Sequence, residues 1–193
     1  MSVRRRRPGA DSAPIERGPD GRALCRFCGA PVPKGRRTFC GDRCVEEWRV
    51  RTDPGYARAR VMGRDHGICA RCGRDTTADQ RALEDARRVY LACRGTGDAA
   101  KAAEHEACAI YGRYGARWGG WWWAPGTWLR LWEAHHATAV VEGGGECGLD
   151  GLVTLCVPCH RRETAALATR RAQGRRRART GATERSFLAG DAE

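Results

Sequence analysis

Closely spaced cysteines are the residues of this sequence with the most specific chemistry. Eight of the 11 cysteines form four pairs whose members stand three or four positions apart: Cys25 and Cys28, Cys40 and Cys44, Cys69 and Cys72, and Cys156 and Cys159. Zinc prefers four tetrahedral ligands, and two thiolates at this spacing reach one ion from a single turn. Four pairs therefore predict two structural Zn2+ sites, each with four cysteine ligands.

The first predicted site lies in the stretch CRFCGAPVPKGRRTFCGDRC. Its first pair forms a knuckle, and Gly29 suits the sharp turn behind it. The residues between the pairs suggest a short hairpin around Lys34 and Gly35, and Cys40 and Cys44 stand at the start of a helix. A knuckle, a hairpin and a helix in this order resemble a treble-clef zinc finger.

The second predicted site joins Cys69 and Cys72 to Cys156 and Cys159 across more than 80 residues. Each pair has no other partner, and the later pair again opens a helix, CHRRETAALATRRA. In small modules zinc binding contributes about 10–16 kcal/mol to folding. The entropic cost of closing a loop grows only with the logarithm of its length, so a long segment between the two pairs is acceptable.

His160 follows Cys159 directly, which raises the question of whether both bind the same ion. Neighbouring residues on a helix point about 100° apart, so the two side chains do not easily face one ion. Because four cysteines already complete the second site, His160 is left for another role.

Two further histidines, His135 and His136, lie upstream in LRLWEAHHATAVVEGGGECGLDGLVTLC. The stretch from Leu129 to Ala137 alternates as a strand, GGGECG supplies a wide turn, and GLVTLC returns towards the helix. This arrangement would carry two histidines on the strand and His160 on the helix.

The combination resembles the HNH (ββα-metal) endonuclease family, over roughly residues 25–172. The family pattern is a His-His or Asp-His pair on the first strand, a glycine-rich loop, Asn-Leu, and a Leu-Cys-x2-Cys-His helix start. The matching residues are His135, His136, Gly143–Gly145, Leu152, Leu155, Cys156, Cys159 and His160. The knuckle RDHGICARCG at 64–73 looks like the one that precedes many HNH modules, and the module order is similar to the nuclease module of a vertebrate annealing helicase.

The resemblance implies a role for each polar residue. His136 would be the general base that takes a proton from the attacking water. His135 and His160 would bind one catalytic divalent cation, which could be Mn2+, Ni2+, Co2+, Zn2+ or Mg2+. Arg161 and Arg162, at the start of the same helix, would hold flanking phosphates. The implied activity is hydrolysis of DNA phosphodiester bonds, as nicking or cleavage.

Two positions depart from the family pattern. Gly151 replaces the asparagine that is understood to brace the loop positioning the base, although Asp150 beside it could compensate. Ala139 replaces the usual proline after the histidine pair. The departures leave a second interpretation open, in which the chain is a catalytically weak or inactive zinc module that binds nucleic acid or a protein.

Positive charge dominates the composition. The 193 residues carry a formal net charge of +12, and only two of the 35 basic residues, Lys34 and Lys101, are lysines. The excess of arginine and the absence of asparagine are typical of a GC-rich genome, so not every arginine need be functional. The net excess still predicts a polyanionic partner, which we take to be DNA.

The sequence thus predicts a small, metal-stabilised α+β fold. Residues 1–23 and 173–193 are expected to be basic, disordered tails, either merely solvated or used to position DNA. Residues 24–60 would form the treble-clef-like finger and a linker helix, and residues 61–172 the HNH domain.

An alanine-rich helical hairpin is expected as an insert at 77–115 of that domain. Its two helices would run over about Asp79–Cys93 and Asp98–Tyr114, joined by the turn RGTG. Cys93 and Cys108, which have no close partner, would be small core residues of this hairpin.

The sequence predicts neither a membrane protein nor a secreted protein. The basic N-terminus has no apolar stretch behind it, and no run of about 18 apolar residues occurs. A reducing compartment favours metal ligands over disulfides, and we expect the chain in the cytoplasm of a bacterium, at the nucleoid when bound to DNA.

Trp121–Trp123 stand in a glycine- and proline-flanked loop that could stack on bases, whereas Trp128 and Trp132 are expected to be core residues.

Overall fold

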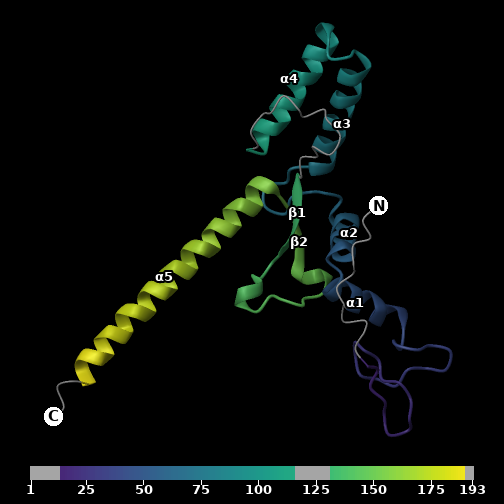
Figure 1. The fold of residues 1–193 in the computed structure, drawn as a ribbon, viewed down its shortest axis with the longest axis vertical. Coiled ribbons are helices and arrows are strands. Elements are labelled where there is room, and N and C mark those ends of the chain that lie inside the picture. The colour runs from purple at the N-terminus through teal and green to yellow at the C-terminus, as the bar shows by residue number, and fades with distance from the viewer. Residues whose placement is uncertain (1–13, 116–130, 190–193) are drawn as a thin grey trace. The chain divides into compact units, whose positions relative to one another are not determined.

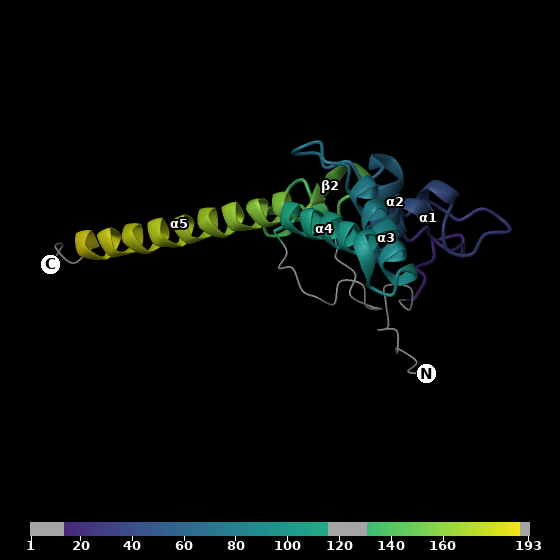
Figure 2. The ribbon, with the colours of Figure 1, turned by 90° about the horizontal axis from the view of Figure 1, so that it is seen from above.

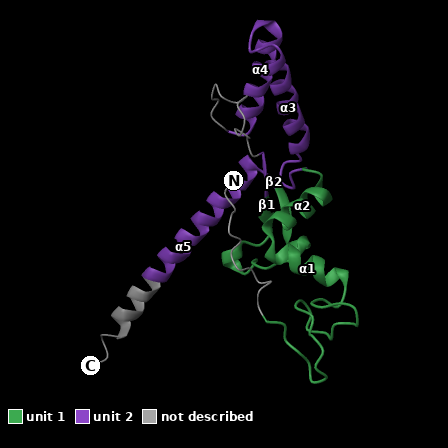
Figure 3. Cartoon of the chain, turned by 45° about the vertical axis from the view of Figure 1, so that its right-hand side comes forward, with its two compact units in different colours: residues 1–67, 134–154 green, residues 68–133, 155–193 purple. Residues whose placement is uncertain are grey.

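The computed structural model describes residues 14–115 and 131–189, with side chains described up to residue 179. Trp121–Trp123 and Trp128 therefore lie outside the described residues. The chain forms two compact units: unit 1 comprises residues 1–67 and 134–154, and unit 2 comprises residues 68–133 and 155–193 (Figure 3). Each unit is assembled from two separate stretches of sequence.

Residues 14–23 form the first part of unit 1, where the sequence predicted a disordered tail. An antiparallel bridge joins Arg17 to Ala23 around the sequence Pro-Asp-Gly. Gly21 adopts a φ of 73°, the conformation for which glycine is favoured at such a turn. A single turn has no periodicity, so only its turn residues could have predicted it.

The finger continues into helix α1, Asp42–Thr52. The chain turns at Lys34–Gly35 as predicted, but the bridge that closes the loop joins Leu24 to Pro31. The helix begins two residues after Cys40 and carries Cys44 in its first turn, which confirms the predicted helix start.

Helix α2, Pro54–Asp65, follows α1 after the single residue Asp53. The Asp53 carboxylate accepts hydrogen bonds from the backbone N–H groups of Gly55 and Tyr56, both at 3.0 Å, and so caps the helix. Pro54 occupies the first helical position, where its missing N–H has little consequence. The buried side chains of the two helices are Val50, Ala57 and Val61.

Strands β1, Trp132–His136, and β2, Leu152–Cys156, form a two-stranded sheet. The backbone bonds just beyond its ends are Ala137 N–H to Gly151 O, 2.9 Å, and Val157 N–H to Leu131 O, 3.0 Å. The reversed order makes the pairing antiparallel. Two short 3-10 turns lie in the connecting loop: η2, Val140–Glu142, and η3, Leu149–Gly151. The predicted strands are confirmed, and within the described residues the first one covers Trp132–His136.

The end of α2 fixes this loop and β2 within unit 1. The Arg64 guanidinium donates to the carbonyl oxygens of Leu149 at 2.8 Å and Leu152 at 2.7 Å. The Asp65 carboxylate accepts from Thr154 N–H at 2.9 Å. The hydrogen bond from Arg64 lowers the pKa of Asp65 against the opposing effect of burial, so the carboxylate stays charged.

Helices α3, Thr76–Ala92, and α4, Gly97–Arg113, lie side by side in unit 2 (Figure 1). They are the helical hairpin that the alanine-rich segments predict, with each end within three residues of its expected position. The buried side chains of the hairpin include Leu83, Ala86, Ala100, Ala103, Ala107 and Ile110.

Cys108 and Cys93 were predicted to belong to that core, and this prediction is wrong. Cys108 is exposed and Cys93 is only partly buried. The buried residues of α4 recur at intervals of three and four, so Cys108, one position after Ala107, falls on another face of the helix.

Helix α5, Val157–Ala189, is one continuous helix (Figure 2). The sequence predicted a disordered tail from residue 173, but α5 runs through that boundary. Its side chains from 168 to 179 are all exposed, and alanine and arginine are among the best helix-forming residues. None of the helices in the described ranges has both the length and the apolarity of a membrane span.

Candidate metal centres and catalytic site

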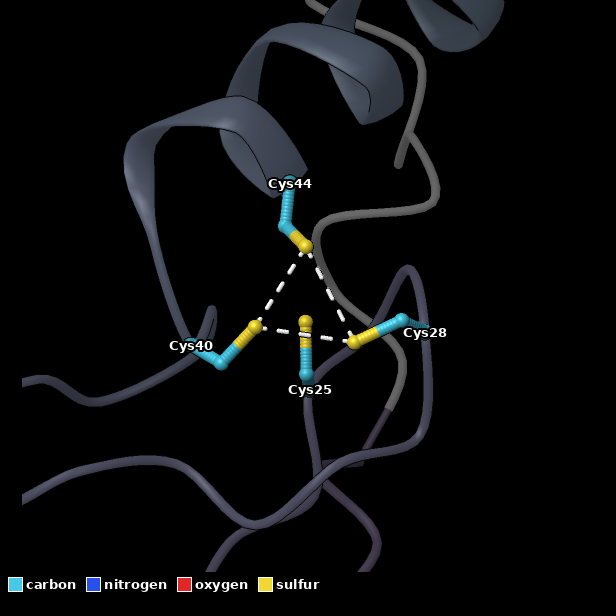
Figure 4. A group of neighbouring side chains, drawn as sticks. All are labelled: Cys25, Cys28, Cys40 and Cys44. Atoms are coloured by element: carbon cyan, nitrogen blue, oxygen red, sulfur yellow. Dashed lines mark hydrogen bonds between the residues drawn. The ribbon is translucent and has the colours of Figure 1, made fainter.

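The first group of four cysteines converges in the finger of unit 1 (Figure 4). Cys25 and Cys28 come from the knuckle, and Cys40 and Cys44 flank the start of α1. Their Sγ atoms all lie within 4.8 Å of one another. Around the group the separations are 3.5 Å from Cys28 to Cys40, 3.4 Å from Cys40 to Cys44 and 3.8 Å from Cys44 to Cys28.

These distances fit a tetrahedral zinc ion. A Zn–S bond of about 2.3 Å places the sulfurs of a tetrahedron about 3.8 Å apart. A disulfide would instead need an S–S distance of about 2.05 Å, and all four thiols are free. The set of four cysteines can therefore hold a structural zinc, as the sequence predicts.

The backbone of the knuckle favours one charged thiolate. Burial raises the pKa of Cys25, but backbone N–H groups of Cys28, Cys40 and Phe27 outweigh it and lower the pKa to about 6. The hydrogen bond with Cys40 raises the pKa of Cys44 to about 12. Zinc must therefore displace protons from Cys40 and Cys44 when it binds, since the pKa values of both are raised.

The second group lies wholly within unit 2 and joins Cys69 and Cys72 to Cys156 and Cys159. Its Sγ atoms also lie within 4.8 Å of one another, with Cys72 and Cys156 3.7 Å apart. Cys69, Cys156 and Cys159 are each at most 2% exposed. The predicted pairing across the long insert is therefore present.

In the second group the backbone likewise favours one charged thiolate. Burial raises the pKa of Cys69, but backbone N–H groups, first that of Cys156, lower it to about 6. Burial raises the pKa of Cys156 to about 12. Burial raises the pKa of Cys159, and the Arg162 guanidinium, which donates to Cys159 Sγ at 2.9 Å, opposes that rise.

Arg161 and Arg162 are both engaged inside unit 2, where the sequence predicted contacts with phosphates. Arg162 contacts the second cysteine group, and the Arg161 guanidinium donates to the carbonyl oxygens of Tyr114 at 3.5 Å and Gly115 at 3.2 Å. These contacts were not visible in the spacing, and the role of the two arginines in holding phosphates stays a prediction.

Tyr114 shows how the insert is anchored in unit 2. It is fully buried and donates to Asp79 at 2.7 Å, while the Arg74 guanidinium lies 5.0 Å from its ring centroid. Burial raises the pKa of Tyr114, so the phenol stays protonated and remains a donor. This contact joins the end of α4 to the first turn of α3.

His135 and His136 are the last two residues of β1, and both are partly buried in unit 1. His136 Nδ1 lies 3.2 Å from the Sγ of Cys147 in the loop before η3. His160, partly buried in the first turns of α5, belongs to unit 2. The predicted set of three histidines around one catalytic ion stays a prediction.

Cys147 is the residue at this site that the sequence analysis missed. Asp150, which was expected to compensate for the missing asparagine at position 151, is exposed in η3. A Cβ added at Gly151 would stand 2.6 Å from Cys147 Cβ and 2.7 Å from its Sγ. The sequence signal that could have identified this residue is that Cys147 is the one cysteine between the histidine pair and β2.

A basic cavity of about 490 Å³ opens on the finger of unit 1. The basic residues that line it are Arg17, Arg22, Lys34, Arg36 and Arg37, and no described lining residue is acidic. Asp42 accepts two hydrogen bonds of 2.9 Å from Arg36 and holds that guanidinium in place. Lys34 and Arg37 form no ion pair among the described residues, so their charges are available to an anion.

Comparison with known proteins identifies relatives. Mouse DNA annealing helicase and endonuclease ZRANB3 is 33% identical over 176 residues, which cover 81% of this chain and 14% of that protein. The bovine and human proteins of the same name are 30% and 29% identical over 170 residues, with the same coverage. The chain is homologous to a segment of these proteins. No protein-family model and no solved structure matches it.

Only a small part of each relative is represented here, since the chain spans about 14% of their length. The resemblance to a vertebrate annealing helicase that the sequence showed is confirmed as homology. The HNH assignment itself stays a prediction.

Proposed function

We propose that the chain is a metal-dependent HNH endonuclease that hydrolyses phosphodiester bonds of DNA. The observation that carries this proposal is the homology, over 81% of the chain, to a protein named DNA annealing helicase and endonuclease. Residues 24–60 act as a treble-clef-like zinc finger with a linker helix, and residues 61–172 as the HNH domain with its helical insert. The two structural zincs hold the finger and the start of α5.

His136 is the proposed general base. A neutral imidazole accepts a proton in the neutral pH range, which suits the activation of water. His135 and His160 are the proposed ligands of the catalytic ion, and imidazole nitrogen is a suitable donor for the first-row divalent metals. When bound, that ion would polarise the scissile phosphate and stabilise charge on the leaving oxygen.

A second function is supported by Gly151, which stands where the resembled family carries asparagine. In this alternative the chain is a catalytically weak or inactive zinc module that binds nucleic acid or a protein. If the chain binds DNA but does not cleave it with any divalent metal, this alternative is favoured.

The catalytic ion is expected to be a transition metal. Magnesium favours oxygen ligands, and a site with two imidazoles and no carboxylate offers it little. Plasmid nicking should therefore be at least about tenfold faster with Mn2+, Co2+ or Ni2+ than with Mg2+. The His135→Asp variant should shift the preference towards Mg2+. Equal rates in all metals, unchanged by that substitution, would exclude His135 as a ligand; no cleavage in any metal would exclude the proposed activity.

The finger cavity is expected to supply DNA affinity. Replacing Lys34 and Arg37 with glutamate removes two cationic groups, so the salt slope of binding should fall by about two and the affinity by about tenfold or more. Fluorescence anisotropy at several salt concentrations measures both. The Arg81→Glu/Lys101→Glu variant makes the same charge change on exposed positions of α3 and α4. An equal loss in both variants would show general charge attraction in place of a finger contact.

A further inference from the structure

The loop before β2 excludes any side chain at position 151. A Cβ on Gly151 would lie 2.6 Å from the Cβ and 2.7 Å from the Sγ of Cys147, and Cβ atoms essentially never make contacts under 3.0 Å. Gly151 is not among the residues with positive φ, so its backbone would accept another residue. Glycine is therefore required here by the space that the Cys147 side chain occupies.

Backbone bonds tie this loop to the end of β1. The Ala137 N–H donates to Gly151 O at 2.9 Å, and Gly151 N–H donates to Gly148 O at 3.0 Å. The Cys147 side chain thereby lies beside the last residue of β1, with its Sγ 3.2 Å from His136 Nδ1. All of these residues belong to unit 1.

We infer that Cys147 is a positioning residue for His136: its sulfur accepts the Nδ1–H hydrogen bond and leaves the Nε2 lone pair to take a proton from water. A neutral imidazole has one donor and one acceptor nitrogen, and the partner of one nitrogen decides the protonation of the other. The contact also fixes the ring orientation at the end of the strand. The inference rests on the proposed nuclease function and adds a residue outside the matched family pattern.

The first test compares Cys147→Ala with Cys147→Ser in the full, zinc-loaded chain. Loss of the partner that orients a metal-ligating histidine costs about 10–100-fold. We expect a loss of the same order for the base, so Cys147→Ala should lower the single-turnover rate by about that factor with DNA affinity within about twofold. The serine hydroxyl can accept the same N–H and should restore most of the rate. Cleavage by Cys147→Ala at the parent rate would overturn the inference.

A second test exchanges the two side chains. Gly151→Asn alone should lower both thermal stability and cleavage, because the asparagine Cβ collides with Cys147. Adding Cys147→Gly removes the collision and places the family's asparagine in the same space, so the double variant should recover stability and at least part of the cleavage. A Gly151→Asn chain as stable and active as the parent would contradict the steric argument.

The third test does not depend on cleavage. Imidazole 15N chemical shifts of His136 should show the proton on Nδ1 in the parent chain and a redistribution between the two nitrogens in Cys147→Ala. If the parent cuts no DNA, the proposed function fails, and these shifts still decide whether Cys147 sets the tautomer. Identical shifts in the two proteins would overturn the inference.

Discussion

Substituting Cys69 with serine is expected to prevent unit 2 from folding. Cys69 is 2% exposed and belongs to a metal group whose two pairs come from separate stretches of chain. Zinc contributes about 10–16 kcal/mol in small modules, and whole domains are stable by only about 5–15 kcal/mol. Loss of one ligand should therefore remove the zinc and most of the cooperative unfolding transition.

Elemental analysis and thermal circular dichroism check this expectation. The parent should contain about two zinc ions per chain, and Cys69→Ser about one. The matched control is Cys108→Ser, because Cys108 is an exposed thiol outside both metal groups. Two zinc ions and an unchanged melting curve in Cys69→Ser would contradict the account of the second centre.

The zinc groups were predictable from the sequence because their chemistry is specific. Four thiolates at the spacing of tight turns have few alternative uses, and the pairing of Cys69 with Cys159 across the insert followed by elimination. The helical hairpin was predictable too, since alanine-rich segments separated by glycines determine local structure without distant contacts.

Other features depended on contacts that a linear pattern does not contain. Arg162 contacts Cys159 because a helix brings residues three apart together, and Cys147 fills the space beside Gly151 because the loop folds back on itself. The predicted length of α5 was too short, because the exposed, arginine-rich part of the helix has the composition of a disordered tail. Steric and hydrogen-bonding competition of this kind arises only in the folded chain.

Replacing His136 with alanine is expected to have the largest effect on activity. A positioned general base contributes about 10²–10⁴-fold to a rate, and the loop between β1 and β2 contains no histidine that could replace it. The fold should be unaffected, because His136 is only partly buried and lies at the end of β1. DNA affinity should change little, since it comes from the basic residues of the chain.

The most direct test of the central claim measures single-turnover nicking of supercoiled plasmid and DNA affinity side by side in three proteins. They are the parent, His136→Ala, and a control, His105→Ala, which alters an exposed histidine of α4. The account predicts that all three bind DNA equally, that the parent and the control nick it at equal rates with Mn2+, and that His136→Ala is slower by about 10²–10⁴-fold. Nicking by His136→Ala at the parent rate would contradict it.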